Sequence, residues 1–320
     1  ITCGNGTDAL QIAMMALGFK PGDEVILPVF TYVATAEVIA LLGLKPVFVD
    51  VKNDSFNIDI DQVEAKITSK TVAIVPVHLF GQCADMEPLL SIAKKHNLCV
   101  IEDYAQAFGA EYTFKDGSVK KAGTMGTLGC TSFFPSKNLG CYGDGGALVT
   151  ADRGLAEKAR MIANHGQRVK YYHDLIGVNS RLDTLQAAIL DVKIKYIKSY
   201  ERNRQSVANF YDRELKEISF LETPYRSPKS THVFHQYTVQ LKGVDRDHFR
   251  QHLDSFGIPS MVYYPVPLHF QKAYQISGIG KGAFPISESL SENVISLPIH
   301  TEMDNDQLSY ICEKIRDYKA

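Results

Sequence analysis

Short apolar runs alternate with amphipathic segments along the first two hundred residues. The apolar runs predict strands at Glu24–Leu27, Pro46–Asp50, Thr71–Val77, Leu98–Ile101, Gly129–Phe134 and Ala147–Thr150, and the intervening segments predict helices at Ala9–Leu17, Ala34–Leu42, Met86–His96, Leu155–Ala163 and Leu182–Tyr200. Alternation of this kind is typical of a mostly parallel sheet with helices on both faces. The pattern therefore predicts a large α/β domain over residues 1–200.

The rest of the chain predicts a smaller α+β domain over residues 201–320. We expect a strand at Gln236–Leu241, a helix at Arg246–Phe256 that ends at a Gly-Ile-Pro sequence, and a last helix at Asp306–Tyr318. A chain of 320 residues is long enough for two domains packed against each other.

The composition is that of a globular chain, with 45% hydrophobic residues, 22% charged residues and a formal net charge of −2. This balance gives no reason to expect nucleic acid or a membrane surface as a partner. The six cysteines are scattered without close metal-type pairs, so we expect reduced core thiols and no metal site. No signal-peptide pattern or membrane-length apolar run is visible, and a cytoplasmic enzyme of small molecules is the expectation.

The candidate chemistry begins with Lys137. The run Thr131–Asn138 delivers this lysine into a turn, directly before the glycine-rich segment Gly140–Gly146. A lysine amine attacks carbonyl groups when desolvation or nearby positive charge lowers its pKa. The alternative is an ordinary surface lysine in a turn, which is the commoner case because buried lysines are rare.

A carboxylate lies upstream at the end of a predicted strand. Asp103 follows the apolar run Leu98–Ile101, and open α/β sheets place their chemistry at such strand ends. A carboxylate there can keep the ring nitrogen of pyridoxal phosphate protonated, so that the ring withdraws electrons during transamination. The alternative is that Asp103 caps a following helix.

The first helix begins with a possible phosphate site. Gly6 and Thr7 precede the helical pattern Ala9–Leu17, and unpaired amides at a helix start bind phosphate well. An ordinary capped helix explains the same residues about equally well. A nicotinamide enzyme is disfavoured, because Gly143–Gly146 precedes a predicted strand instead of following one and opening a helix.

Three features occur in the order used by fold-type I pyridoxal phosphate enzymes. They are the possible phosphate site at a helix start, the aspartate at a strand end and the lysine that follows later in the chain. The chain resembles the DegT/StrS sugar aminotransferases along nearly its whole length. The resemblance is carried by Gly4–Leu10, Pro21–Val25, Thr31–Thr35, Glu102-Asp103, Ser132–Lys137 and Gly143–Gly146. It implies an α/β fold like that of aspartate aminotransferase, and it implies that a segment found in relatives before the first helix is missing here.

The resemblance also assigns roles to individual residues. Lys137 would form the Schiff base with the cofactor and move the substrate proton, while Asp103 would pair with the pyridine nitrogen. Cofactor contacts would further come from Gly6, Thr7, Tyr32, Gln106, Ser132 and Asn179. Gly6, Thr7 and Ser132 would hold the phosphate, Gln106 would reach the phenolic oxygen, and Tyr32 would stack on the ring, although a core aromatic is a serious alternative for Tyr32.

Asn179 would reach the phosphate of the neighbouring subunit, so the resemblance implies a homodimer with shared active sites. One departure from the family pattern is Tyr104, where many relatives have alanine. Its side chain is expected to point away from the cofactor, and the role of Gln106 depends on that orientation.

Substrate contacts would come from Arg181, Tyr264 and His269. Tyr264 and His269 could donate to a diphosphate, and Arg181 could hold a carboxylate. The alternatives carry about equal weight: His269 could lie at the domain interface, and Arg181 could pair with Asp183 or with a helix end.

The implied reaction moves an amino group from glutamate to a nucleotide-linked keto-sugar. The segments Gly81–Asp85, Gly140–Gly145 and Asn179–Ala188 are most similar to enzymes that aminate C3 of UDP-N-acetyl-3-oxo-glucuronate for surface polysaccharides. Leu268-His269 resembles the dTDP-3-oxo-6-deoxyhexose aminotransferases just as well, and a 4-keto-sugar aminotransferase is a further alternative. A lysine-free dehydratase is disfavoured by Lys137, and a non-catalytic sensor that binds the cofactor stays open.

Overall fold

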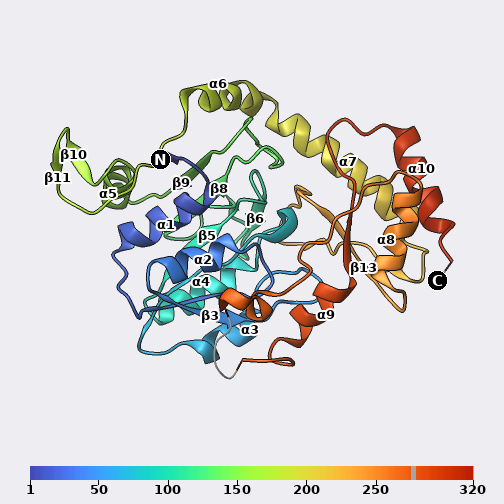
Figure 1. Cartoon of the computed structure of the whole chain (residues 1–320), viewed down its shortest axis with the longest axis horizontal. Coiled ribbons are helices and arrows are strands. Elements are labelled where there is room, and N and C mark those ends of the chain that lie inside the picture. Colours follow the sequence, from blue (N-terminus) through green and yellow to red (C-terminus); the bar gives the residue numbers. More distant parts are fainter. Residues whose placement is uncertain (275–278, 320) are drawn as a thin grey trace.

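A seven-stranded sheet forms the centre of the computed structural model, which describes residues 1–274 and 279–319 (Figure 1). The strands lie in the order β1-β9-β8-β5-β4-β2-β3. Their bounds are Thr2–Cys3 (β1), Glu24–Pro28 (β2), Lys45–Val49 (β3), Thr71–Ile74 (β4), Cys99–Asp103 (β5), Leu128–Ser132 (β8) and Gly146–Val149 (β9). The strands from β8 to β3 are parallel, and β9 runs antiparallel to both of its neighbours. The expected mostly parallel sheet is confirmed.

Helices cover both faces of this sheet. On β2, Val25 and Leu27 pack into one core with α1 (Gly6–Leu17), α2 (Ala34–Leu41) and α5 (Arg153–Ala163). Ile26, between them, packs into a second core with α3 (Ile60–Val63) and α4 (Met86–Lys95). Successive side chains of a strand point to opposite faces, so a strand buried on both sides reads as the continuous apolar run seen in the sequence.

A second, antiparallel sheet lies in the C-terminal part, in the order β12-β13-β14. Its strands are Leu221–Glu222 (β12), Tyr237–Leu241 (β13) and Val294–Leu297 (β14), and the accompanying helices are α7 (Ile197–Leu215), α8 (Arg246–Ser255), α9 (Pro285–Asn293) and α10 (Asn305–Arg316). Tyr211, Phe249 and Ile311 pack helices α7, α8 and α10 around this sheet. Figure 1 shows α7 running from the large sheet towards these elements.

Two predicted elements differ from the structure. The single helix expected at Leu182–Tyr200 is instead α6 (Thr184–Lys193), a 3₁₀ turn at Ile194–Tyr196, and α7. The strand expected at Thr71–Val77 is shorter, since β4 ends at Ile74, although the Val75 amide still donates to the Ile26 carbonyl and Val77 forms an isolated bridge with Asp103. Pro76, between these two residues, has no N–H to donate to the ladder. The boundary predicted between the two domains, at residue 200, falls inside α7. The division into two domains stays a prediction.

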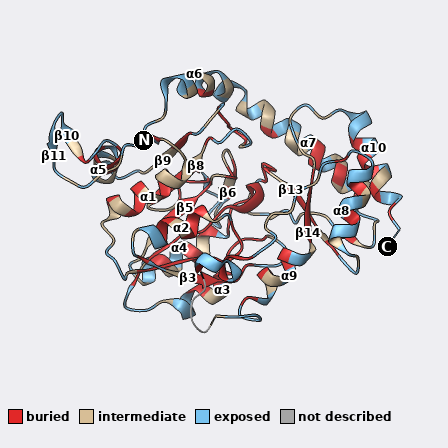
Figure 2. Ribbon diagram, viewed as in Figure 1, coloured by how far each residue is buried: buried red, intermediate tan, exposed pale blue. Residues whose placement is uncertain are grey.

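Short hairpins extend from the large sheet and were not predicted. They are formed by β6 (Glu111–Thr113) with β7 (Val119–Lys121) and by β10 (Gln167–Val169) with β11 (Tyr172–His173). Figure 2 shows the β10–β11 hairpin and much of α6 as exposed. Ile176 between them is 86% exposed and Leu185 on α6 is 71% exposed. Large apolar side chains thus gather on a face that this chain alone leaves uncovered.

None of the helices within residues 1–274 and 279–319 combines the length and apolar character needed to cross a membrane.

Candidate active site

A cavity of about 710 Å³ lies where the carboxyl ends of the parallel strands meet residues from the C-terminal part. Among the residues singled out from the sequence, its walls contain Gly6, Thr7, Tyr32, Asp103, Gln106, Ser132, Lys137 and Tyr264. Strand ends of an open α/β sheet are the expected place for a ligand site. Residues separated by up to 258 positions therefore meet in one cavity.

The start of α1 forms one wall. Asn5 caps the helix, with its side-chain oxygen 2.8 Å from the Asp8 amide, and the amides of Gly6 and Thr7 precede any acceptor within the helix. A Cβ atom at Gly6 would lie 2.7 Å from the Cβ of Ser132. Glycine at position 6 therefore lets the helix start pack directly on the end of β8.

Asp103 is the last residue of β5 and is buried. Its Oδ2 accepts a 2.9 Å hydrogen bond from the Thr35 hydroxyl, and its Oδ1 accepts from the Ala105 amide at 3.2 Å. Thr35 lies on α2, so two elements fix the orientation of this carboxylate. The helix-cap alternative is not what the structure contains, since no helix follows β5 directly.

Lys137 lies in the loop after β8, where its amide donates to the Phe134 carbonyl at 2.8 Å. The side chain is half-buried and reaches the cavity. Burial lowers the pKa of the Lys137 amine, and the negative charge of Asp103 opposes part of that shift. A neutral amine is consequently more accessible here than on a surface lysine.

Gln106 connects two parts of the wall. Its Oε1 accepts from the Phe80 amide at 2.8 Å, and its Nε2 donates to the Tyr264 hydroxyl at 3.0 Å. Burial raises the pKa of Tyr264, which stays a hydroxyl. The ring centroids of Tyr264 and Tyr32 are 6.3 Å apart, and Tyr32 is largely exposed, so it is not a core aromatic in this chain.

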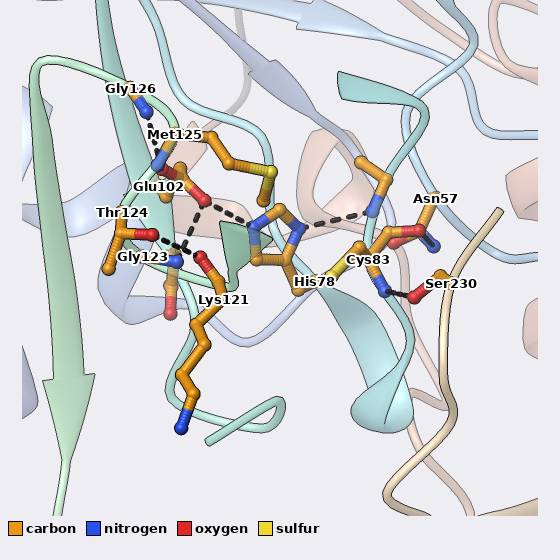
Figure 3. A network of polar contacts seen from close by, with 12 residues as sticks. Asn57, His78, Cys83, Glu102, Lys121, Gly123, Thr124, Met125, Gly126 and Ser230 are labelled. Carbon is orange, nitrogen blue, oxygen red and sulfur yellow. Dashed lines mark hydrogen bonds and ion pairs between the residues drawn. The ribbon is translucent and has the colours of Figure 1, made fainter. Parts of the chain in front are cut away.

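Directly behind Asp103, the buried Glu102 carboxylate receives four hydrogen bonds (Figure 3). The donors are His78 Nε2 at 2.9 Å and the amides of Gly123, Met125 and Gly126 at 2.8, 2.6 and 2.5 Å. His78 Nδ1 accepts from the Ala84 amide at 3.1 Å, which assigns the ring proton to Nε2. The His78 amide also donates to the backbone carbonyl of Asp103 at 2.9 Å, so His78 contacts the side chain of Glu102 and the backbone of Asp103.

Tyr104 points away from the cavity, as expected. Its ring stacks on Phe108 with centroids 6.2 Å apart, and it packs among the buried residues of the α3–α4 face of the sheet. A Cβ atom at Gly123 would lie 2.3 Å from the Tyr104 ring, so glycine there leaves room for the ring. Tyr104 therefore leaves Gln106 free to reach the cavity.

Three predicted site residues do not line the cavity of this single chain. Asn179 and Arg181 are exposed in the segment between the β10–β11 hairpin and α6. His269 is buried, with Nε2 3.2 Å from the Glu288 carboxylate, and its ring packs on Phe284. This placement matches the interface alternative for His269 and gives no support to a diphosphate contact.

Other cavity residues were not singled out from the sequence. They include Thr31, Phe80, Asp144, His235, Gln236 and Tyr263. Gln236 is the first residue of the strand expected from the sequence, and His235 directly precedes that strand. An unusual density of histidines at 232 and 235 was the available signal.

The donor set of the cavity fits pyridoxal phosphate. The amides of Gly6 and Thr7 have no helix acceptor, the buried Thr131 hydroxyl has no hydrogen-bond partner among the described residues, and a lysine of lowered pKa faces the same space as Asp103. Within the part of the chain that the structure describes, no cluster of three or more His, Cys, Asp or Glu side chains could hold a metal ion.

A mostly parallel α/β sheet with these groups at its strand ends is the arrangement of a fold-type I pyridoxal phosphate-dependent transferase. Over residues 1–316 the sequence matches the DegT/DnrJ/EryC1/StrS aminotransferase family, and the chain belongs to that family. Aminotransferases of this family depend on pyridoxal phosphate.

Individual relatives agree with this membership. The UDP-2-acetamido-2-deoxy-3-oxo-D-glucuronate aminotransferase of Pseudomonas aeruginosa is 48% identical over 98% of this chain and 84% of its own length. The "Pleiotropic regulatory protein" of Geobacillus stearothermophilus is 48% identical over 99% of this chain and 84% of its own length. The crystal structure of DesV from S. venezuelae, in complex with a ketimine intermediate, has a TM-score of 0.94 at 40% identity and covers 99% of this chain and 84% of DesV.

Proposed function

We propose that this protein transfers an amino group from glutamate to a nucleotide-linked keto-sugar, at C3 of UDP-N-acetyl-3-oxo-glucuronate. The observation that carries the proposal is the half-buried Lys137 amine, of lowered pKa, on the same cavity as the buried Asp103 carboxylate. Support for the substrate comes from the Pseudomonas aeruginosa relative that is named for this sugar.

Bound pyridoxal phosphate supplies an aldehyde that condenses with amines and a ring that withdraws electrons. The Lys137 amine, whose pKa burial lowers, would accept the proton from the substrate carbon and return it. The Asp103 carboxylate, fixed by Thr35, would hold a proton at the ring nitrogen. The Gly6 and Thr7 amides, with Ser132, would bind the phosphate at the helix start.

Around the ring, Tyr32 and Gln106 are the proposed contacts, and Tyr264 is the proposed substrate contact. Lys137 is the only lysine or arginine among the described residues that line the cavity. A carboxylate on glutamate or on a glucuronate would therefore meet a cation from elsewhere, and Arg181 of a second copy is our candidate.

The proposed active unit is a homodimer in which Asn179 and Arg181 complete the site of the other copy. The apolar side chains around Ile176 and Leu185, exposed in one chain, support an interface on that face. The proposed setting is the cytoplasm, where nucleotide sugars would be aminated for a surface polysaccharide.

A dTDP-3-oxo-6-deoxyhexose is the second candidate acceptor, because relatives from Streptomyces venezuelae and Aneurinibacillus thermoaerophilus carry dTDP-sugar names. A cofactor-binding sensor is the candidate of another class, favoured by the regulatory name of the Geobacillus stearothermophilus relative.

The test is an absorbance spectrum of the protein with pyridoxal phosphate before and after glutamate, with Lys137→Ala in parallel. We expect a visible band that glutamate removes in the native protein alone, and that a suitable nucleotide-linked keto-sugar restores. If no amino donor changes the band, the aminotransferase proposal is wrong and the cofactor-binding sensor is the better explanation. The choice between the UDP and dTDP sugars follows from which of them restores the band.

A further inference from the structure

His235 is carried into the active-site cavity by residues that precede β13. The Val233 amide donates to the Gly81 carbonyl at 2.9 Å, and the side chain of Asn138, next to Lys137, donates to the Val233 carbonyl at 2.9 Å. The C-terminal part of the chain thereby contacts both the turn after β4 and the loop that carries Lys137.

The backbone at His235 is tightly fixed. Phe234 has a φ of 46°, a left-handed conformation that bulky residues adopt only where their surroundings enforce it. Arg204 on α7 donates to the carbonyls of Phe234 and His235 at 2.9 and 3.4 Å. A Cβ atom at Gly81 would lie 2.9 Å from the His235 amide nitrogen, so the two backbones meet without an intervening side chain.

Despite this fixed backbone, the imidazole of His235 makes no hydrogen bond with any described residue. It is 6% exposed, it lines the cavity, and its buried Nδ1 has no partner. Buried polar groups are nearly always paired, and leaving one unpaired carries the full cost of its desolvation. A ring held rigidly at the cavity wall without a partner is explained by a ligand that supplies the partner.

The ring is also uncharged. Burial lowers the pKa of His235 well below its ordinary value, and the positive charges of Lys137 and Arg204 lower it further. A neutral imidazole offers one N–H donor and one lone pair and no net charge. Carboxylates and phosphates bind best to charged donors, whereas hydroxyl and keto oxygens are suited to neutral ones.

We infer that His235 contacts the acceptor sugar, by a hydrogen bond to an uncharged hydroxyl or keto oxygen next to the reacting carbon. The inference rests on the proposed function and adds a specificity-determining residue to it. Glutamate presents two carboxylates beside its amine, so the sugar is the substrate with neutral oxygens to offer.

The test compares two amino donors in the same half-reaction. Glutamate and a nucleotide-linked 3-amino sugar, the product supplied in reverse, should both remove the visible band of the cofactor-loaded protein. In His235→Phe, which keeps a ring but no nitrogen, we expect kcat/KM for the amino sugar to fall roughly 10- to 100-fold. The value for glutamate should change less than about threefold, and His235→Gln should recover part of the loss.

His96→Phe is the matched control, because His96 lies on the surface beside Glu64 and away from the cavity. Equal losses for both donors in His235→Phe would assign His235 to a step shared by both substrates and overturn the inference. Unchanged rates for both donors would overturn it as well.

A second readout needs no turnover. The imidazole resonance of His235, assigned by its absence in His235→Gln, should shift when UDP-N-acetylglucosamine is added to the native protein. If the native protein reacts with glutamate but with no sugar nucleotide, the proposed function fails, and this resonance decides the inference. No shift with the UDP-sugar would overturn it.

Discussion

Glu102 and Asp103 are consecutive residues of β5 whose carboxylates serve opposite sides of the strand. Asp103 lines the cavity, whereas Glu102 is enclosed by His78 and by the amides of Gly123, Met125 and Gly126. Neighbouring side chains in a strand alternate between its two faces. Of two consecutive acids at a strand end, one can therefore face the cavity while the other accepts hydrogen bonds that stabilise the surrounding loops.

The first prediction concerns the hydrogen bonds that the Glu102 carboxylate receives. Glu102→Gln leaves one acceptor oxygen and introduces an NH₂ group among four donors, so buried groups lose their partners. We expect the free energy of unfolding to fall by about 2–4 kcal/mol, measured by urea denaturation. Glu313→Gln, on an exposed pair with Lys314, is the control and should change it by less than about 0.5 kcal/mol. If Glu102→Gln is as stable as the control variant, the hydrogen bonds to Glu102 do not contribute to the free energy of unfolding.

The second prediction is a pH dependence of stability. Burial by itself raises the pKa of Glu102, but hydrogen bonds from His78 and from the Gly126 and Gly123 amides outweigh it and hold this pKa below the ordinary 4.5. The unfolded chain therefore binds the proton at higher pH than the folded one. The contribution of Glu102 is fully present above about pH 4.5 and is lost as the pH falls through its folded pKa. Acid unfolding curves of the native protein should be steeper below pH 4.5 than those of Glu102→Gln.

The third prediction concerns the phosphate cradle. In Gly6→Ala the added Cβ meets Ser132 at 2.7 Å, so the start of α1 must move away from β8. The affinity for pyridoxal phosphate, measured by absorbance titration, should fall at least roughly tenfold, since charge-assisted contacts at a helix start are lost together. Gly154→Ala, at the start of α5, is the control and should bind the cofactor like the native protein. Unchanged affinity in Gly6→Ala would move the phosphate to another site.

The fourth prediction uses the cofactor-free protein. The Asp103 charge raises the pKa of Lys137 against the larger effect of burial, so Asp103→Asn should lower that pKa further. Modification of Lys137 by an amine-specific reagent, followed by mass spectrometry, should then reach half its maximal rate at a lower pH than in the native protein. Asp54→Asn, on the exposed surface, should leave this midpoint in place. If the pH midpoint of Lys137 modification rises in Asp103→Asn, the Asp103 carboxylate does not raise the pKa of Lys137 as inferred.

The fifth prediction tests the homodimer. The double variant Ile176→Asp with Leu185→Asp puts two charges on the exposed apolar face, so we expect association to weaken at least roughly tenfold in sedimentation equilibrium. Val119→Asp changes an exposed apolar residue of β7 and should associate normally. Equal association of both variants would place the interface on another face.

Much of the fold could be predicted because the large sheet is buried on both sides. Val25, Ile26 and Leu27 all face a core, so β2 reads as an uninterrupted apolar run. The short strands β6 and β10 carry no such signal, because their side chains are partly exposed. The break at Ile194–Tyr196 was missed since no proline or glycine marks it.

The residues of the candidate site likewise include some that the sequence could predict and some that it could not. Gly6, Asp103 and Lys137 each follow a recognisable local pattern, and the structure brings them to one cavity. His235 has no such pattern, because its importance arises from contacts with Gly81 and Arg204, which lie far away in the sequence. Pairings of this kind depend on the tertiary structure, which local periodicity does not contain.

Helix α7 joins the two sheets as a stiff rod. With 19 residues it spans about 28 Å, and it carries Arg204, which donates to the carbonyl of His235. A flexible tether would let the C-terminal part swing independently of the cavity. A continuous helix instead ties the position of the C-terminal part to the backbone that carries the imidazole.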